Sequence, residues 1–150
     1  MTIAYLVDTD WVIHHLHGHA AIQQRLQDLH PEGLGLSVVA LAELYEGVAS
    51  ARDPVQSEQG LHDFLQSVTL VGIDEVTARL FGRERGRLRA AGALIGDMDL
   101  LIAATALQYN VTLLTNNPPL RAHCRPAHRV ALTLCCPGPV WETQGTRPTS

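Results

Sequence analysis

Short apolar segments alternate along the chain with longer segments whose apolar residues recur at helical spacing. The short segments have the length and content of buried strands, and the longer ones are typical of amphipathic helices. The predicted strands span residues 3–8, 34–37, 68–71 and 111–115. The predicted helices are two within 10–29, divided near Gly18, and one each over 38–48, 55–67, 74–91 and 95–109. Because parallel strands require crossover connections, this alternation predicts a parallel sheet covered by helices on both faces.

Residues at the ends of three predicted helices are of the types that begin or end helices. Ser37 precedes VVALAELYEGV and is predicted to cap that helix. Gly92 is predicted to end the Arg-rich helix before it. Asp97 directly follows Gly96 and is therefore the predicted cap of the last helix, which would leave Asp99 in its first turn without a capping role.

The chain of 150 residues has the size of one domain, and its composition changes near the C-terminal end. Residues 134–150 are rich in Pro, Gly, Ser and Thr, which is typical of a segment that buries little apolar surface. We therefore predict a folded domain over residues 1–133 and a loosely structured tail over 134–150. No apolar run approaches the roughly 18 residues that a membrane span needs, and no secretion signal is recognisable, so we expect a cytoplasmic protein without a membrane partner.

The charged residues exclude several classes of enzyme. The formal net charge is −4 at pH 7, which does not by itself favour a nucleic-acid-binding protein. The 11 residues counted as Lys or Arg are all Arg. The absence of Lys excludes the phosphate-binding loops, the Schiff-base chemistry and the protein-kinase chemistry that require a lysine.

Three acidic residues stand in apolar surroundings, where an unpaired charge costs several kcal/mol. Asp8 ends the first predicted strand, Glu43 lies within the apolar part of its helix, and Asp99 precedes LLIAATAL. Each has a structural alternative. Asp8 could bond the turn that follows it, and Asp99 could interact with the positive end of its helix. Glu43 could share an exposed helix face with Glu46.

Taken together, the three acids can converge on the edge of the sheet where parallel strands end. Carboxylates within about 4 Å of one another repel by several kcal/mol at an effective dielectric of about 20. Such a group either takes up protons or binds a cation. Ligands that are all oxygen suit Mg2+ or Mn2+, and an ion held by few carboxylates keeps waters that can attack phosphorus.

Four segments carry a pattern that resembles a known family. YLVDTDWVIHHL, SVVALAELYEGV, GDMDLLIAATAL and VTLLTNN occur in the order and spacing of the PIN-domain nucleases, and they are most similar to the VapC-type toxins of bacterial toxin–antitoxin pairs. The resemblance implies a three-layer α/β/α sandwich with a short parallel sheet. It also implies a metal-dependent endoribonuclease in which Asp8, Glu43 and Asp99 hold Mg2+, or Mn2+ in its place. An RNA substrate, a small cognate antitoxin protein and a homodimer are its further implications.

Four more residues are expected to support the acids. Thr9, Asp97, Thr115 and Asn117 are candidates for fixing a carboxylate or a water from outside the set of metal ligands. The pattern departs from the family after Asn117, because this chain has Asn116 and Asn117 where relatives often carry a fourth acid. The altered C-terminal part leaves an alternative open, in which the chain is an impaired toxin homologue that still binds its antitoxin.

Two other features of the sequence bear on function. Arg79, Arg83 and Arg87 recur at every fourth position and form one stripe of a helix, which is either a set of RNA phosphate contacts or a solvated face. The segment LVDTDW is also compatible with a haloacid-dehalogenase-like phosphotransferase, in which Asp8 and Asp10 would be the nucleophile and the acid. That chemistry normally requires a downstream Lys, and the chain has none.

Overall fold

The helices and strands occur in the order that the sequence predicts, in a computed structural model that describes residues 2–93, 95–118 and 120. The strands are β1 (Tyr5–Val7), β2 (Leu34–Ser37), β3 (Thr69–Val71) and β4 (Thr112–Leu114). The helices are α1 (Thr9–Leu16), α2 (Ala20–Leu29), α3 (Val38–Ala49), α4 (Pro54–Leu65), α5 (Glu75–Ala90) and α6 (Asp97–Tyr109). A short 3-10 turn at His30–Glu32, which the sequence analysis did not predict, connects α2 to the strand that follows.

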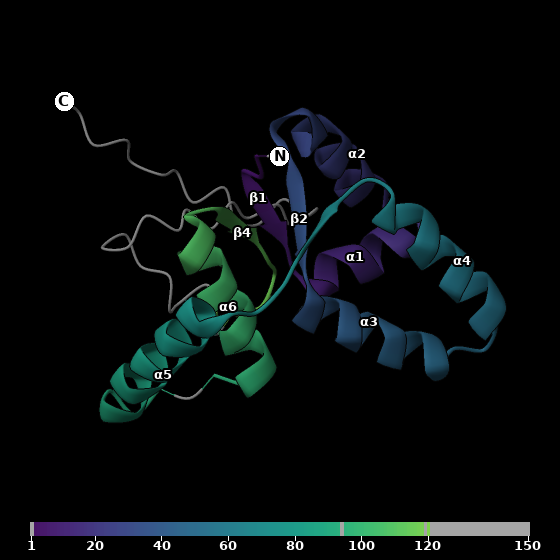
Figure 1. Cartoon of the computed structure of the whole chain (residues 1–150). Coiled ribbons are helices and arrows are strands. Elements are labelled where there is room, and N and C mark those ends of the chain that lie inside the picture. Colours follow the sequence, from purple (N-terminus) through teal and green to yellow (C-terminus); the bar gives the residue numbers. More distant parts are fainter. Residues whose placement is uncertain (1, 94, 119, 121–150) are drawn as a thin grey trace.

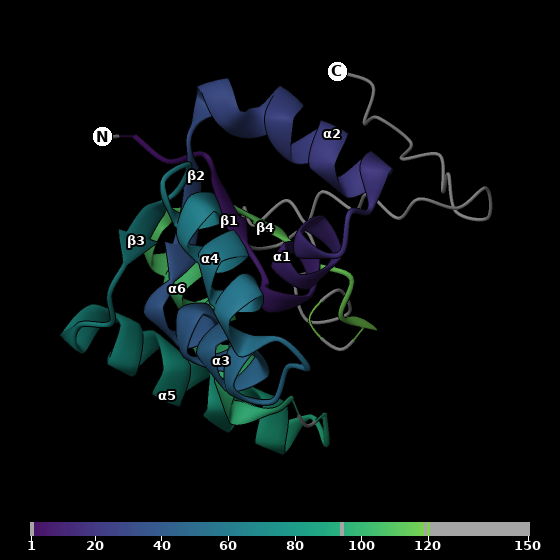
Figure 2. The ribbon, with the colours of Figure 1, turned by 90° about the vertical axis from the view of Figure 1, so that its right-hand side faces the viewer.

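The four strands form one parallel sheet in the order β3-β2-β1-β4. The chain moves outward from β1 through β2 to β3, and then returns to the other side of β1 for β4. Because parallel crossovers are right-handed, this reversal puts the later helices on the opposite face from the earlier ones. Figure 1 shows α5 and α6 on one side of the sheet and α1 and α4 on the other, and Figure 2 shows the second layer from its outer side. The predicted three-layer α/β/α sandwich is confirmed.

The core lies on both faces of the sheet, because the central strands are mainly apolar and buried. Leu6, Leu36 and Leu113 are fully buried in three neighbouring strands. Trp11, in the first turns of α1, is also fully buried. Helix α6 buries residues all around its axis, from Leu100 to Ala106, as its uninterrupted apolar sequence indicates.

Two helix caps were predicted from the sequence, and the structure confirms that of α3 but not that of α6. The Ser37 hydroxyl accepts a hydrogen bond from the Val39 N–H at 3.1 Å, which confirms the predicted cap of α3. The prediction that Asp97 caps α6 is wrong. Gly96 is the extended residue before that helix, and Asp97 is already helical. Its exposed carboxylate forms an ion pair with Arg85 of α5 instead.

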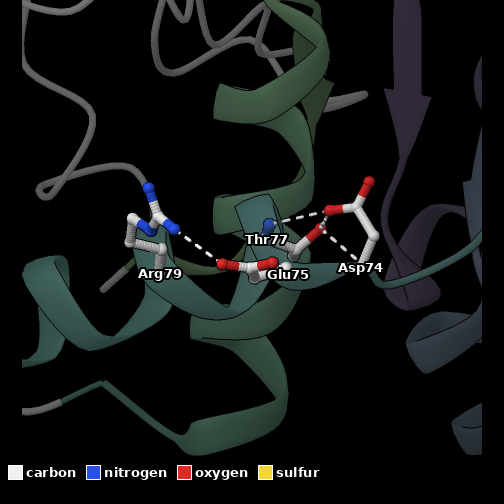
Figure 3. Close-up of polar contacts among 4 residues, drawn as sticks. All are labelled: Asp74, Glu75, Thr77 and Arg79. Carbon is white, nitrogen blue, oxygen red and sulfur yellow. Dashed lines mark hydrogen bonds and ion pairs between the residues drawn. The ribbon is translucent and has the colours of Figure 1, made fainter.

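Helix α5 begins with a capping box, shown in Figure 3. The Asp74 carboxylate accepts a hydrogen bond from the Thr77 N–H at 3.0 Å, and the Thr77 hydroxyl accepts one from the Asp74 N–H at 3.3 Å. One turn further on, Arg79 pairs with Glu75 at 2.6 Å. The reciprocal bonds satisfy two N–H groups that have no partner within the helix, and they fix where α5 begins after β3.

None of the helices among residues 2–93, 95–118 and 120 is long and apolar enough to cross a membrane. The predicted boundary at residues 133 and 134, and the tail that follows it, lie outside the described residues.

We predict that Gly33→Ala lowers the free energy of unfolding by about 1–3 kcal/mol. Gly33 has a φ of 95°, and a Cβ there would lie 2.2 Å from the Thr2 carbonyl oxygen. Gly47→Ala in α3 is the matched control, because nothing lies within 4 Å of its added Cβ. Alanine in a helix interior stabilises by up to about 1 kcal/mol relative to glycine, so the two variants should move in opposite directions in urea unfolding. Equal effects would contradict the backbone argument.

Candidate active site

The pairing of β1 with β4 places two candidate residues side by side at the carboxyl edge of the sheet. Val7 is the register partner of Leu114, so the next residue of each strand, Asp8 and Thr115, meet directly beyond the sheet. The Asp8 N–H donates to the Leu114 carbonyl at 3.0 Å and continues the strand pairing to this point. The Thr115 hydroxyl donates to Asp8 Oδ2 at 2.6 Å.

Asp8 is a buried carboxylate, with 3% of its surface exposed. Its Oδ1 accepts the Thr9 N–H at 2.8 Å, so Asp8 also caps α1. The pKa of Asp8 is raised to about 7, chiefly by burial and also by the negative charges of Asp10 and Asp99, against the lowering effect of its hydrogen bonds. The structural role considered for Asp8 is therefore real, but its two hydrogen bonds do not offset the cost of burying the charge.

Asn117 joins this pair to Asp99. The Asn117 N–H donates to Thr115 Oγ1 at 3.0 Å, and its side-chain amide donates to Asp99 Oδ2 at 2.8 Å. A continuous set of hydrogen bonds thus runs from Asp8 through Thr115 and Asn117 to Asp99. Asp99 lies in the first turn of α6, and its carboxylate is thus held by the segment that follows β4.

Glu43 reaches the same region from α3 through a different partner. The Thr9 hydroxyl, at the start of α1, donates a hydrogen bond to Glu43 Oε2. Glu43 is half-buried, whereas Glu46, which would share an exposed face with it, is exposed. The starts of α1 and α6 and the first turns of α3 thus bring Asp8, Asp99 and Glu43 to one edge of the sheet.

The remaining predicted residues, Asp97 and three arginines, form ion pairs on α5. Asp97 points to α5, where it pairs with Arg85, and 80% of its side chain is exposed. Arg79, Arg83 and Arg87 share one side of α5 with 78%, 65% and 49% of their side chains exposed. Each has a carboxylate partner on its own helix, Glu75 for the first and Glu84 for the other two.

Asp10 belongs to the site, although the sequence analysis did not select it as a site residue. Its Oδ2 accepts the Asn116 N–H at 2.8 Å and its Oδ1 accepts the Trp11 N–H at 2.8 Å. Burial raises the pKa of Asp10. The signal in the sequence is the spacing of Asp8 and Asp10 in LVDTDW, which was interpreted only as a motif that phosphotransferases share.

The donors at this edge fit a hard divalent cation. Among the described residues, no group of three or more His, Cys, Asp or Glu side chains is placed so that it could hold a metal ion. Mg2+ does not require such a group, because it usually binds one or two carboxylates and keeps several waters. The buried Asp8 carboxylate, whose pKa is raised partly by Asp99, is a site where a positive charge would remove an electrostatic cost.

The fold and the site define a class of α/β protein: a short parallel sheet between helical layers, with acids at the strand ends where the direction of the chain reverses. The family model of the PIN domain matches residues 5–125. The chain therefore belongs to the PIN domain family, as its sequence motifs indicated.

Curated relatives and solved structures of the same family carry VapC names. Ribonuclease VapC2 of Rickettsia felis is 30% identical over 115 residues, which cover 75% of this chain and 86% of the relative. Ribonuclease VapC19 of Mycobacterium tuberculosis is 33% identical over 112 residues, covering 75% and 87%. The structure of VapBC2 from Rickettsia felis bound to a promoter DNA fragment aligns with a TM-score of 0.80 and 26% identity, over 88% of this chain and 98% of that one. The resemblance to VapC-type proteins is confirmed.

We predict that Asp8→Asn makes the metal-free protein more stable at high pH. The pKa of Asp8 is higher in the folded chain, about 7, than its ordinary value of 3.8, so folding is favoured while Asp8 is protonated. This contribution is complete below pH 4 and is lost as the pH rises to about 7. The variant should therefore exceed the wild type by on the order of 1–4 kcal/mol above pH 7, and the gain should shrink toward pH 4.

Urea unfolding in EDTA across this pH range measures the effect. Asp28→Asn is the matched control, because Asp28 is exposed on α2 and its side chain accepts a hydrogen bond from the Gln24 side chain of the same helix. Parallel stability curves for the wild type and Asp8→Asn would contradict the raised pKa.

Proposed function

We propose that the chain is a metal-dependent endoribonuclease, the toxin of a VapBC-type toxin–antitoxin pair, that hydrolyses RNA phosphodiester bonds. The observation that carries this proposal is the hydrogen-bonded path from Asp8 through Thr115 and Asn117 to Asp99, at the carboxyl edge of a PIN domain. The relatives named Ribonuclease VapC support the reaction class. The chain contains no Lys that could neutralise charge on a phosphoryl group, which supports a cation supplied from solution.

Asp8 and Asp99 are the proposed direct ligands of Mg2+, with Mn2+ as a substitute, and Glu43 binds directly or through water. When bound, the ion stabilises the charge that develops on the phosphoryl oxygens and makes a water more acidic. Thr115 holds Oδ2 of Asp8 and Asn117 holds Oδ2 of Asp99, so both carboxylates are oriented before substrate arrives. Thr9 orients Glu43 in the same way. Asp97 acts at most indirectly, through the loop before α6.

The reaction is a hydrolysis in which a water oxygen bonds to phosphorus and one phosphorus–oxygen ester bond breaks. The water proton passes to the departing ribose oxygen. Carboxylates fixed by short hydrogen bonds do not need to reorganise during this step, which is the usual source of electrostatic catalysis. The chain's own contribution is therefore the geometry of Asp8, Asp99 and Glu43.

A small cognate antitoxin and a second copy of the chain are the proposed partners, and the cytoplasm is the proposed location. The solved neighbours include VapBC complexes, such as the one from Rickettsia felis and VapBC-1 from nontypeable Haemophilus influenzae, which aligns with a TM-score of 0.72, 27% identity and coverage of 81% of this chain and 92% of that one. The competing function is a toxin homologue that binds its antitoxin without cleaving RNA, and the same assay separates the two.

We predict that the purified chain cleaves a structured RNA in Mn2+ or Mg2+ and does not cleave it in EDTA. Asp8→Asn and Asp99→Asn should each lower kcat by at least about 100-fold, the scale of losing a group that acts on the transition state. Asp28→Asn is expected to match the wild type. Wild-type turnover in either site variant at saturating metal would show that the residue is assigned wrongly, and an inactive wild type that still binds an antitoxin would favour the competing function.

We propose that the stripe of Arg79, Arg83 and Arg87 contacts RNA phosphates, and Arg83 offers the clearest test. Its nearest carboxylate atom, on Glu84, lies 3.7 Å away, against 3.0 Å for Arg87. Arg83→Gln should raise KM several-fold, leave kcat within about twofold and reduce the salt dependence of binding by about one counterion. Arg52→Gln, in the exposed segment between α3 and α4, is the control. Equal behaviour of the two variants would make the stripe a solvated face.

A further inference from the structure

Asp10 connects the first turn of α1 to the segment that follows β4. The contact joins residues that are 106 positions apart in the chain, from Asp10 Oδ2 to the Asn116 N–H at 2.8 Å. The other oxygen, Oδ1, accepts the Trp11 N–H at 2.8 Å. Both oxygens thus accept main-chain N–H groups, one within α1 and one in the segment that follows β4.

The segment held by Asp10 is the one that reaches both proposed metal ligands. Thr115 donates to Asp8 and Asn117 donates to Asp99, and Asn116 lies between them. The Thr115 hydroxyl also accepts the Asn117 N–H at 3.0 Å, which turns the chain tightly here. The position of the Asn117 amide relative to Asp99 therefore depends on the backbone at Asn116, and the side-chain contact that fixes this backbone N–H comes from Asp10.

A purely local role would explain only half of these contacts. An acid in the first turn of a helix interacts favourably with the helix dipole, and the Trp11 hydrogen bond has this character. The bond to Asn116 has no such explanation, because Asn116 lies outside α1, in the segment that follows β4.

We propose that Asp10 is a positioning residue, which holds residues 115–117 so that Asn117 stays bonded to Asp99. Its effect on catalysis rests on the proposed ribonuclease function, whereas its effect on the segment does not. Among the hydrogen bonds of the described residues, Asp10 makes none to Asp8 or Asp99, and it acts through Asn116 and Asn117.

The first test is amide hydrogen exchange of the full chain, measured by NMR in EDTA. Asp10→Ala should make the Asn116 N–H exchange at least tenfold faster and should shift the Asn117 side-chain amide signals. Asp53→Ala is the matched control, since Asp53 also accepts a main-chain N–H at a helix start, that of Gln56 at 3.1 Å, but lies at the start of α4. It should lower stability to a similar degree and leave Asn116 unchanged. Unchanged Asn116 exchange in Asp10→Ala would overturn the proposal.

The second test is kinetic and uses RNA cleavage in Mn2+. Asp10→Ala should lower kcat by about 10–100-fold, the usual cost of removing a residue that orients a metal ligand, with KM within about twofold. Asp53→Ala should leave both constants within about twofold of the wild type. If Asp10 only stabilises the fold, Asp10→Ala will leave kcat and KM within about twofold of the wild type, as Asp53→Ala does. That result would overturn the proposal.

A double-mutant cycle shows whether Asp10 acts through Asn117. In the Asn117→Ala background, adding Asp10→Ala should change kcat by no more than about twofold, because the contact that Asp10 maintains is already lost. Fully additive losses would mean that Asp10 acts by another route and would overturn the proposal. If the wild type cleaves no RNA, the proposed function fails, and the exchange of the Asn116 amide alone then decides whether Asp10 holds the segment.

Discussion

The site depends on the parallel pairing of β1 with β4. This pairing ends at Val7 and Leu114 and is extended by one hydrogen bond from Asp8 to the Leu114 carbonyl. The pairing buries the Asp8 carboxylate beside the Thr115 hydroxyl. They lie where the sheet order changes direction, because β2 and β3 lie on one side of β1 and β4 on the other. A shift of either strand by one residue would turn Asp8 or Thr115 to the other face of the sheet, so the register of two three-residue strands sets the whole arrangement.

The burial of Asp8 is an electrostatic cost that the fold does not remove by itself. The two hydrogen bonds to Asp8 lower its pKa, but burial and the neighbouring acids outweigh them and leave the pKa at about 7. Structural acids in this chain are treated differently. Asp74 is exposed, and its hydrogen bonds to Thr77 and Gln108 lower its pKa. Asp74 therefore stabilises the start of its helix, whereas burying the charge of Asp8 costs free energy. Functional carboxylates are commonly of the second kind.

The helices and strands, and the choice of Asp8, Glu43 and Asp99 as candidates, could be predicted from the sequence because each has a local cause. Buried strands are apolar runs, Ser37 precedes a helical pattern, and Asp8, Glu43 and Asp99 interrupt apolar segments in which acids are rare. Asp97 and Asp10 were not predictable in the same way. The partner of Asp97 is an arginine on the preceding helix, and that of Asp10 is a backbone N–H 106 positions away. Neither contact leaves a periodic pattern, because both depend on how α5 and the end of β4 pack.

We propose that Asp8 and Asp99 share one divalent ion, and anomalous diffraction from crystals of the chain grown with Mn2+ tests this proposal. We expect an anomalous peak between the two carboxylates, with Asn117 still bonded to Asp99, and no peak at this place in crystals of Asp8→Asn. An ordered Mn2+ at another place in a chain that cleaves RNA, with the space between Asp8 and Asp99 free of anomalous signal, would contradict it.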